Sequence, residues 1–361
     1  MRVGLDVTQA AKTRGRGIAR YIRQVLPPLD EQGLELTLCI RSDRVLRRSL
    51  VSDLAPGSAR AWLPVSAWLT VGGLDLFHSF GNHLPSLANT PLTFTVHDFR
   101  SLDRPINAKT GKSRLRRNIE RAAGIICLTR HGEQRLRHHF PNIDPSRISV
   151  IPHGVDHAQF RRQDLSRAQE TAGGYGLERP FVLQLGSWFE HKNLELSIRG
   201  FARSEARREG FQLAFIGGGA SESYQASLNT IAKEAGVADR LSWIENVPGK
   251  DLPLLLTAAS CLLQPSRYEG FALPILEAMA TGTPGVVSDS SCLPEVSGGV
   301  WPVCGQSDEE AFAVAIDRMV LGTPAREAVI LAGLQHASHF TWEQTAQQTA
   351  AFFRRIHEYE N

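Results

Sequence analysis

Two glutamates stand eight positions apart in the run Glu-Gly-Phe-Ala-Leu-Pro-Ile-Leu-Glu, which extends from Glu269 to Glu277. Proline suits the first turn of a helix, where its missing N–H would have no partner, so Pro274 predicts that a helix begins here. The N-terminus of a helix, with its positive dipole and unpaired N–H groups, is a site for an anion. We expect those N–H groups to be the ones of Gly270, Phe271, Ala272 and Leu273.

The two carboxylates would flank this anion site, because Glu277 lies one turn into the predicted helix and Glu269 on the loop before it. Ionised carboxylates accept hydrogen bonds from hydroxyl groups. An anion between two such acceptors fits a sugar nucleotide, with phosphate in the middle, the ribose on one side and the sugar on the other. A surface loop that is simply capped by a glutamate explains the spacing equally well.

A candidate positive charge follows the strand predicted at 181–185, in the segment Gly-Ser-Trp-Phe-Glu-His-Lys-Asn. Lys192 in this turn suits the neutralisation of a diphosphate, since a lysine ammonium is a compact point charge. An exposed surface lysine is the alternative. Gly217 opens a run of three glycines after the strand predicted at 212–216, and such a turn permits close approach of a ligand. A plain turn is an equally good interpretation there.

The first half of the chain carries two further candidates. His97 ends the strand predicted at 92–97, where it would donate to a sugar hydroxyl or move a proton. Gly17 closes the turn Arg-Gly-Arg-Gly, which leads into a helix and would let the backbone approach a phosphate. A structural histidine and an ordinary tight turn are the alternatives for these two positions.

The sequence gives no sign of a metal site or of a hydrolytic triad. It lacks the Asp-x-Asp pair by which many sugar-nucleotide enzymes hold a divalent ion. His131, His138 and His139 lie on an arginine-rich helical segment, without carboxylate or cysteine partners at ligand spacing. No G-x-S-x-G nucleophile motif is present. We therefore expect no metal and no cofactor.

The composition is typical of a soluble protein of two domains. The chain has 361 residues, of which 42% are hydrophobic and 21% are charged. Its five cysteines are scattered and form no C-x-x-C pair, which favours a reducing cytoplasm over a disulfide framework. The start Met-Arg-Val-Gly-Leu-Asp-Val predicts a first strand rather than a signal peptide, and no apolar run approaches the ~18 residues of a membrane span.

The net charge of +3 is small, but basic residues gather between Lys109 and Arg121, where Glu120 is the single acid. A basic helix of this kind fits an anionic membrane surface or an acidic substrate. A solvated helix face is the alternative. Nucleic acid is not an expected partner, because no aromatic residue interleaves with these charges and no known binding motif is present.

Short apolar runs alternate with amphipathic segments along the whole chain, which predicts an α/β protein with parallel sheets. The strands are expected at 3–7, 34–40, 74–79, 92–97, 124–128, 148–151, 181–185, 212–216, 241–244, 261–264, 285–288 and, weakly, 299–303. A polar, strand-poor segment at 161–179 predicts a linker between domains 1–160 and 180–340, and 341–361 predicts a final helix that packs back on the first domain. In such sheets ligands bind at the carboxyl ends of the strands, which is where the candidate residues lie.

Taken together, these motifs resemble family 4 of the retaining glycosyltransferases. The resemblance rests first on the run from Gln264 to Pro284 and its continuation through Asp289 and Glu295. It extends, in the order of the family, to the segments 17–21, 97–98, 150–156 and 186–193, and so covers nearly the whole chain. The resemblance implies a GT-B fold, in which two Rossmann-like domains face each other across a cleft.

The resemblance also implies roles for single residues. Glu269 and the backbone of 270–273 would hold the donor sugar and its phosphate, Glu277 the ribose, and Lys192 the leaving diphosphate. Gly17 would approach the diphosphate from the other domain, and His97 would touch the transferred sugar. The implied catalytic residues are thus His97, Lys192 and Glu269. The implied donor-binding residues are Gly17, Ser187, His191, Lys192, Gly217, Val247, Glu269, Gly270, Phe271, Ala272, Leu273 and Glu277.

Three positions depart from the family pattern. Many members carry arginine where this chain has Ser187, and some bacterial mannosyltransferases carry arginine where it has His191. A second cationic contact to the phosphate is therefore missing, unless protonated His191 or another arginine supplies it. Ala19 replaces the second glycine of the usual turn, which is a mild change if its φ is negative.

The resemblance implies metal-independent transfer of a sugar from a nucleotide donor, with retention at the anomeric carbon. GDP-mannose is the first expectation for the donor, followed by a UDP-sugar. The acceptor is expected to be a growing or polyprenyl-linked glycan of a surface polysaccharide such as an O-antigen. The alternatives are a nucleotide-sugar-binding protein without catalysis, and epimerisation or phosphorolysis on the same fold. A nicotinamide dehydrogenase is disfavoured, because Gly15 and Gly17 lack the third glycine of G-x-G-x-x-G.

Overall fold

The computed structural model describes residues 1–10, 17–41, 54–55, 58–63, 73–81, 84–85, 90–103, 109–322 and 324–360. The chain forms two compact units, which are described separately. Unit 1 consists of Met1–Gly154 together with Thr341–Asn361, and unit 2 of Val155–Phe340.

Unit 1 is built on a parallel sheet of seven strands in the order β3-β2-β1-β4-β5-β6-β7. These strands are β1 (Arg2–Asp6), β2 (Glu35–Arg41), β3 (Ala59–Leu63), β4 (Leu76–Ser79), β5 (Leu92–Val96), β6 (Gly124–Cys127) and β7 (Ile148–Val150). Six of them were predicted. Strand β3 was not, because its sequence Ala-Arg-Ala-Trp-Leu has no clear alternation, and as an edge strand it pairs with β2 alone.

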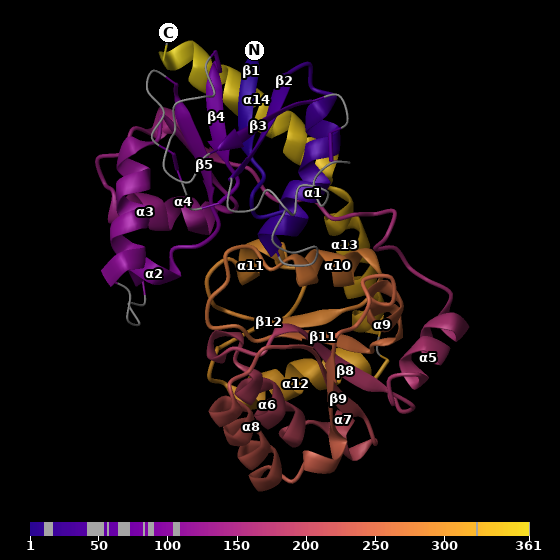
Figure 1. Ribbon diagram of the computed structural model, residues 1–361. Coiled ribbons are helices and arrows are strands. Elements are labelled where there is room, and N and C mark those ends of the chain that lie inside the picture. Colours follow the sequence, from indigo (N-terminus) through magenta and orange to yellow (C-terminus); the bar gives the residue numbers. More distant parts are fainter. Residues whose placement is uncertain are drawn as a thin grey trace. The chain divides into compact units, whose positions relative to one another are not determined.

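The final helix of the chain packs on unit 1, as predicted. Helix α14 (Trp342–Glu360) lies beside α1 (Gly17–Asp30), and its Trp342 and Phe353 are buried in one core with β1 and β2 (Figure 1). The other helical segments of this unit are α2 (Arg100–Asp103), α3 (Lys109–Arg121), α4 (Arg130–His139) and the 3₁₀ turn Pro145–Arg147.

Unit 2 repeats this architecture with a parallel sheet of six strands in the order β10-β9-β8-β11-β12-β13. The strands are β8 (Phe181–Ser187), β9 (Gln212–Gly218), β10 (Leu241–Glu245), β11 (Cys261–Gln264), β12 (Gly285–Ser288) and β13 (Val303–Cys304). All six were predicted, although β13 begins four residues later than the start of the predicted segment 299–303. Gly298 and Gly299 adopt positive φ angles of 60° and 69°, so the chain turns there before the strand begins.

The helices of unit 2 cover both faces of its sheet. They are α5 (Leu165–Gly173), α6 (Leu194–Arg203), α7 (Glu205–Arg208), α8 (Glu222–Glu234), α9 (Leu252–Ala258), α10 (Leu273–Ala280), α11 (Leu293–Val296), α12 (Glu309–Val320) and α13 (Pro324–Ser338), with 3₁₀ turns at Glu190–Lys192 and Ala238–Arg240. Among the described helices, none combines the length and the apolar composition that crossing a bilayer requires.

The segment 161–179 differs from the predicted linker. It belongs to unit 2 and contains α5, which packs against α9. The side chain of Asp164 caps this helix by accepting a hydrogen bond from the Arg167 amide. Ala168 and Ala172, four residues apart, bury the inner face of the helix, and such small residues leave little hydrophobic signal in a polar sequence. The division between the units falls after Gly154 rather than after residue 160.

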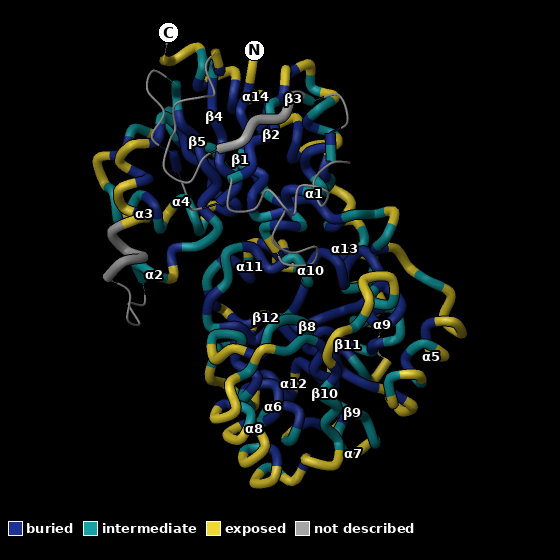
Figure 2. The backbone as a smooth tube through the Cα atoms, viewed as in Figure 1, coloured by how far each residue is buried: buried dark blue, intermediate teal, exposed yellow. Residues whose placement is uncertain are grey.

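The strands that position the functional loops are buried on both faces, as parallel sheets covered by helices require. Every residue of β4, β5, β6, β11 and β12 is buried. Figure 2 shows β4 and β5 in dark blue. Polar residues therefore come to the surface chiefly in the loops at the strand ends. The loops that follow β8, β9, β10 and β11 share one edge of the sheet in unit 2, because these strands are parallel and adjacent.

Candidate functional site

The two charged residues singled out in unit 2 form a direct ion pair. Lys192 ends the 3₁₀ turn after β8, and Glu269 lies on the loop after β11, so neighbouring strands bring them to the same edge of the sheet. The Lys192 Nζ atom lies 2.5 Å from Glu269 Oε1. Their side chains are 17% and 10% exposed, respectively. Sequence reasoning found both residues but did not foresee that they bind each other.

Three side chains donate hydrogen bonds to the same oxygen of Glu269. Besides Lys192, these are Gln264 Nε2 at 2.9 Å and Ser266 Oγ at 2.7 Å from Oε1. Within the described residues, no group donates to the second oxygen, Oε2, which therefore keeps its full capacity to accept. The loop itself is held by the Glu269 amide, which donates to Ser291 Oγ at 2.9 Å.

The surroundings of Glu269 keep its carboxyl group ionised. Burial acts to raise the pKa of this group, but the charge and hydrogen bond of Lys192, the Ser266 hydroxyl and the charge of His191 outweigh it. Together they hold the pKa of Glu269 below its usual range. His191 thus acts as a second cationic influence close to Lys192, at the position where some relatives carry arginine.

Asn193 fixes the position of the lysine loop. It lies in the left-handed region, with φ 56° and ψ 48°, between the 3₁₀ turn and α6, and it is 1% exposed. Its Nδ2 atom donates to the carbonyls of Pro265 and Gln306, each at 3.0 Å. One amide therefore joins the loops that follow β8, β11 and β13. The sequence signal was the Asn directly after Lys192, since asparagine tolerates this conformation better than most residues.

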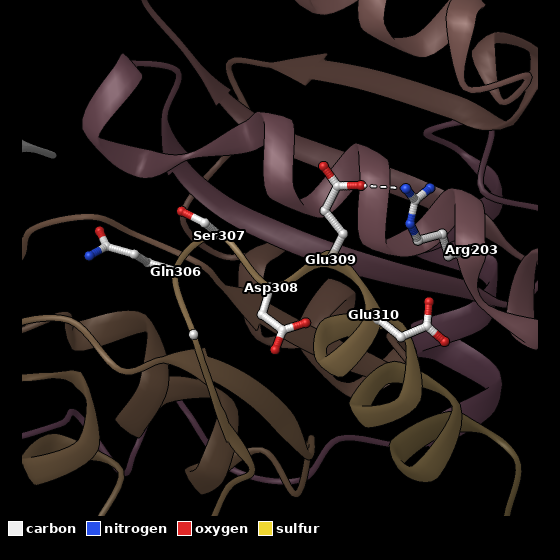
Figure 3. A pocket seen from close by; sticks show the side chains of 7 residues that line it. Arg203, Gln306, Ser307, Asp308, Glu309 and Glu310 are labelled. Carbon is white, nitrogen blue, oxygen red and sulfur yellow. Dashed lines mark ion pairs between the residues drawn. The ribbon is translucent and has the colours of Figure 1, made fainter.

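A pocket of about 720 Å³ lies beside this junction, at the carboxyl end of β13 (Figure 3). Two of the acidic side chains that line it make contacts at the start of α12. Arg203 pairs with Glu309 at 2.9 Å, and the Asp308 carboxylate accepts from the Ala311 amide. The residues that line the pocket are Arg203, Gly305, Gln306, Ser307, Asp308, Glu309 and Glu310.

Helix α10 begins as the sequence predicts, with Pro274 in its first turn and Glu277, 1% exposed, one turn further on. Ala272 caps it in a left-handed conformation, with φ 67° and ψ 60°, which costs an alanine ~1 kcal/mol. The backbone amides of Gly270, Ala272 and Leu273 donate no hydrogen bond to any group in the described part of the chain. Such N–H groups at a helix N-terminus favour an anion.

Gly217 is a glycine for a reason that the sequence did not reveal. It pairs with Gly186 across β8 and β9, and a Cβ atom at Gly217 would overlap the Gly186 carbonyl oxygen. Ser187 continues this register opposite Gly218. Val247 follows the end of β10 and is half-buried. The donor-binding roles of Ser187, Gly217 and Val247 stay predictions.

His97 and Gly17 belong to unit 1. His97 follows β5, and its Nε2 atom lies 2.6 Å from the Phe80 carbonyl oxygen. Because a carbonyl only accepts, Nε2 carries the hydrogen, and Nδ1 is the acceptor of the neutral ring. Burial lowers the pKa of His97, against the opposing effects of the Phe80 carbonyl and Asp98. Gly17 is the first residue of α1, and residues 14–16 of its turn lie outside the described residues.

The predicted basic helix is α3, and its exposed face carries arginine. Arg114, Arg116, Arg117 and Arg121 are exposed, whereas Leu115 and Ile119 are buried against unit 1. The side chains of Lys109 and Lys112 lie outside the described residues. Contact between this face and an anionic membrane stays a prediction.

His78 makes the stability of unit 1 depend on pH. It is fully buried in β4, with its ring nitrogens 2.9 Å from Thr93 Oγ1 and 3.2 Å from Thr95 Oγ1. Burial, with a contribution from His97, lowers the pKa of His78 to about 3. The unfolded chain protonates this ring near pH 6.5, so it binds more protons than the folded chain below that pH. Stability therefore falls as the pH falls from about 6.5 towards 3, by up to ~1.4 kcal/mol per pH unit from this residue.

Glutamine keeps a polar side chain at this position but does not titrate. We therefore expect His78→Gln to reduce the slope of unfolding free energy against pH by up to ~1.4 kcal/mol per pH unit between pH 6.5 and 4.5. Urea unfolding of unit 1 at several pH values measures the slope. The same substitution at His138, an exposed histidine of unit 1, is the matched control. An unchanged slope in His78→Gln would contradict the assignment of the proton uptake to His78.

Comparison with known proteins agrees with this architecture. Residues 15–159 match the family described as "Glycosyltransferase Family 4", and residues 168–336 match "Glycosyl transferases group 1". The chain is 42% identical over 120 residues to O-antigen chain mannosyltransferase B of Escherichia coli, an alignment that covers 32% of each chain. It is 25% identical over 357 residues to a D-inositol 3-phosphate glycosyltransferase of Acidothermus cellulolyticus, covering 94% of this chain and 76% of that one.

The chain spans only about a third to a half of some of these curated relatives, with 46% of a Mycobacterium marinum D-inositol 3-phosphate glycosyltransferase covered at 32% identity. Solved structures share the fold over nearly the whole chain at low identity. Sucrose-phosphate synthase from Thermosynechococcus elongatus superposes with a TM-score of 0.75 at 17% identity, covering 98% of both chains. Anabaena Alr3699/HepE in complex with UDP-glucose gives 0.76 at 14% identity, covering 97% of this chain and 98% of that one. The chain therefore has the GT-B fold and belongs to family 4 of the glycosyltransferases.

Proposed function

We propose that this protein is a retaining glycosyltransferase, which moves a sugar from a nucleoside diphosphate donor to a glycan acceptor without a metal ion. The observation that carries the proposal is the ion pair between Lys192 and Glu269, next to the open N-terminus of α10. Cleavage of the glycosyl bond leaves negative charge on the diphosphate. Donors that are already oriented towards this charge stabilise the transition state with little reorganisation.

Each group of this site has a place in the reaction. A lysine ammonium has three N–H donors, so Lys192 keeps two for the diphosphate while one binds Glu269. The amides of Gly270, Ala272 and Leu273 provide further donors to the same charge. Glu269 Oε2 is free to accept from the hydroxyls of the transferred sugar, since the protein's own donors converge on Oε1.

Retention of the anomeric configuration is proposed to follow a front-face route. In this route the acceptor attacks from the side on which the diphosphate leaves, and the leaving phosphate takes the acceptor's proton. The bond from the anomeric carbon to the phosphate oxygen breaks as the bond to the acceptor oxygen forms. Glu269 is held by three donors on one oxygen with its pKa lowered, which suits binding of hydroxyls better than proton transfer.

For the substrates we propose GDP-mannose as the donor, with a UDP-sugar as the alternative, and a growing or polyprenyl-linked surface glycan as the acceptor. The names of relatives support this choice, because they include O-antigen chain mannosyltransferases of Escherichia coli and Salmonella typhimurium. The arginine face of α3 would hold the protein at an anionic inner membrane surface. A nucleotide-sugar-binding protein without catalysis is the competing proposal.

Transfer of labelled sugar to lipid-linked glycans extracted from membranes tests this function. We expect release of a nucleoside diphosphate, transfer that continues in the presence of EDTA, and a product with the anomeric configuration of the donor by NMR. Inversion would contradict the retaining route, and loss of transfer with EDTA would contradict the absence of a metal. Diphosphate binding without transfer or hydrolysis of any donor would favour the competing proposal.

A further inference from the structure

An aromatic ring lies exposed at the carboxyl edge of the sheet in unit 2. Phe189 follows β8, three residues before Lys192, and is 48% exposed. Its ring packs against His191, with the ring centres 5.9 Å apart and an angle of 28° between the planes. On its other flank it borders the glycine turn after β9, since a Cβ atom at Gly219 would lie 3.6 Å from the ring. This part of the edge therefore offers a flat apolar surface to solvent.

A carboxylate borders the same glycine turn. Glu245 is the last residue of β10 and is exposed, and its Oε1 atom lies 3.3 Å from the place of a Cβ atom at Gly218. Within the described residues, no group pairs with this carboxylate or donates to it. Gly218 and Gly219 have φ angles of 141° and 88°, so they leave a floor without side chains between Phe189 and Glu245.

The order of the strands indicates which end of a bound nucleotide would reach Phe189 and Glu245. Lys192 follows β8 and Glu269 follows β11, whereas Glu245 ends β10, on the other side of β9. Neighbouring strands are about 4.8 Å apart, so the end of β10 lies about 10 Å from the end of β8. A diphosphate bound at Lys192, with the sugar towards Glu269, thus extends its nucleoside towards Phe189 and Glu245.

The side chains of Phe189 and Glu245 differ in how they would bind the four bases. An aromatic ring stacks on any base, so Phe189 gives affinity without choice. A carboxylate accepts hydrogen bonds but donates none, so Glu245 requires two neighbouring donors for a two-point contact. Guanine offers them as N1–H and the 2-amino group. Uracil places its single N–H between two carbonyl oxygens, and adenine and cytosine place an acceptor beside their amino group, which a carboxylate repels.

From this geometry we infer that Glu245 is a specificity residue that reads the guanine of a GDP-sugar stacked on Phe189. The inference deepens the proposed function and rests on it, because it takes the diphosphate to lie at Lys192. It assigns the choice of donor base to the side chain of Glu245, and affinity that does not depend on the base to Phe189.

Calorimetric titration with GDP, IDP and UDP tests this assignment, since IDP differs from GDP only in lacking the 2-amino group. We expect the wild-type protein to bind GDP at least about tenfold more tightly than IDP or UDP, the scale of a lost two-point contact. Glu245→Gln is expected to reduce the preference for GDP over IDP to less than about threefold and to change UDP binding little. Phe189→Ala is expected to weaken all three, because stacking does not depend on the base.

Glu234→Gln is the matched control, since Glu234 is an exposed glutamate at the C-terminal end of α8, and it should leave the three affinities unchanged. Equal binding of GDP and IDP by the wild-type protein, or an unchanged preference in Glu245→Gln, would overturn the inference and leave the proposed function standing. Failure of every diphosphate to bind would overturn both.

Discussion

Lys192→Met is expected to lower the rate of sugar transfer by at least ~100-fold, which is the scale of losing one preorganised contact to transition-state charge. The ammonium nitrogen lies 2.5 Å from Glu269 Oε1, so a contact within the protein itself fixes its position. Methionine keeps an unbranched side chain of similar length but provides neither the charge nor the N–H donors. Initial rates with saturating donor measure the effect. Turnover near that of the wild-type protein would remove Lys192 from the reaction.

The same substitution is expected to destabilise unit 2. The side chain of Glu269 is only 10% exposed, and without Lys192 its carboxylate has no cation to pair with. Loss of one partner from a buried pair costs about 3 kcal/mol. Without Lys192, the two strongest influences that lower the pKa of Glu269, its charge and its hydrogen bond, are lost, and the pKa of Glu269 rises. The stability that the ionised carboxylate contributes is then lost at a higher pH than in the wild-type protein as the pH falls.

The double variant Lys192→Met/Glu269→Gln separates the structural role of the pair from the catalytic one. Removing both charges takes away the unpaired carboxylate, so we expect urea unfolding to show most of the lost stability restored. The rate is expected to stay low, because the diphosphate still lacks its cation. If the double variant also recovered the rate, Lys192 would act only by supporting the fold.

Gly217→Ala is expected to destabilise unit 2 by at least ~3 kcal/mol, because the new methyl group would overlap the Gly186 carbonyl oxygen. That carbonyl belongs to the central ladder between β8 and β9, so neither strand can move away without breaking hydrogen bonds of the sheet. The loops that carry Lys192 and Phe189 follow β8 directly, and we expect diphosphate binding to weaken as well. Urea unfolding and calorimetric titration measure the two effects.

Gly173→Ala is the matched control for this substitution. Gly173 is the last residue of α5, and a Cβ atom there would meet no other atom within 4 Å. Alanine is the better helix former, so we expect a change of less than ~1 kcal/mol in the opposite direction. A loss of stability in Gly217→Ala no larger than the change in this control would show that the strands accommodate the methyl group.

Much of the fold could be predicted, because buried parallel strands leave short apolar runs in the sequence. Strands such as β5, Leu-Thr-Phe-Thr-Val, are of this kind. Strand β3 lacks this pattern, and α5 buries only the small side chains Ala168 and Ala172 in a polar segment. These two elements were missed because neither shows a clear hydrophobic pattern in the sequence, although β3 pairs with β2 and α5 packs against α9.

The candidate site was predictable residue by residue but not contact by contact. Motif resemblance identified Lys192, Glu269 and Glu277, and the start of α10 followed from Pro274. The convergence of Gln264 and Ser266 on one oxygen of Glu269 depends on how a single loop folds back, which no spacing reveals. The clamp formed by Asn193 joins positions 72 and 113 residues away in the chain, so it required the structure.

The departures from the family pattern have a physical interpretation in the folded chain. His191 occupies the place of an arginine, and its charge contributes to lowering the pKa of Glu269. A second cationic contact from protonated His191 to the donor phosphate stays a prediction. Ser187 pairs with Gly218 across β8 and β9. Where many family members have the guanidinium group of an arginine, this chain has a neutral hydroxyl group that donates one hydrogen bond.

The central claim is that a nucleoside diphosphate binds at Lys192 without a metal ion, and a thermal-shift measurement tests it most directly. Each of GDP and UDP is added, with and without EDTA, to the wild-type protein and to the Lys192→Met/Glu269→Gln variant. A ligand at 100 times its Kd adds ~2.7 kcal/mol of stability, which is a shift of a few degrees in Tm. The account predicts such a shift with GDP in the wild-type protein, unchanged by EDTA and largely lost in the variant. No shift with either diphosphate, a shift abolished by EDTA, or an equal shift in the variant would contradict it.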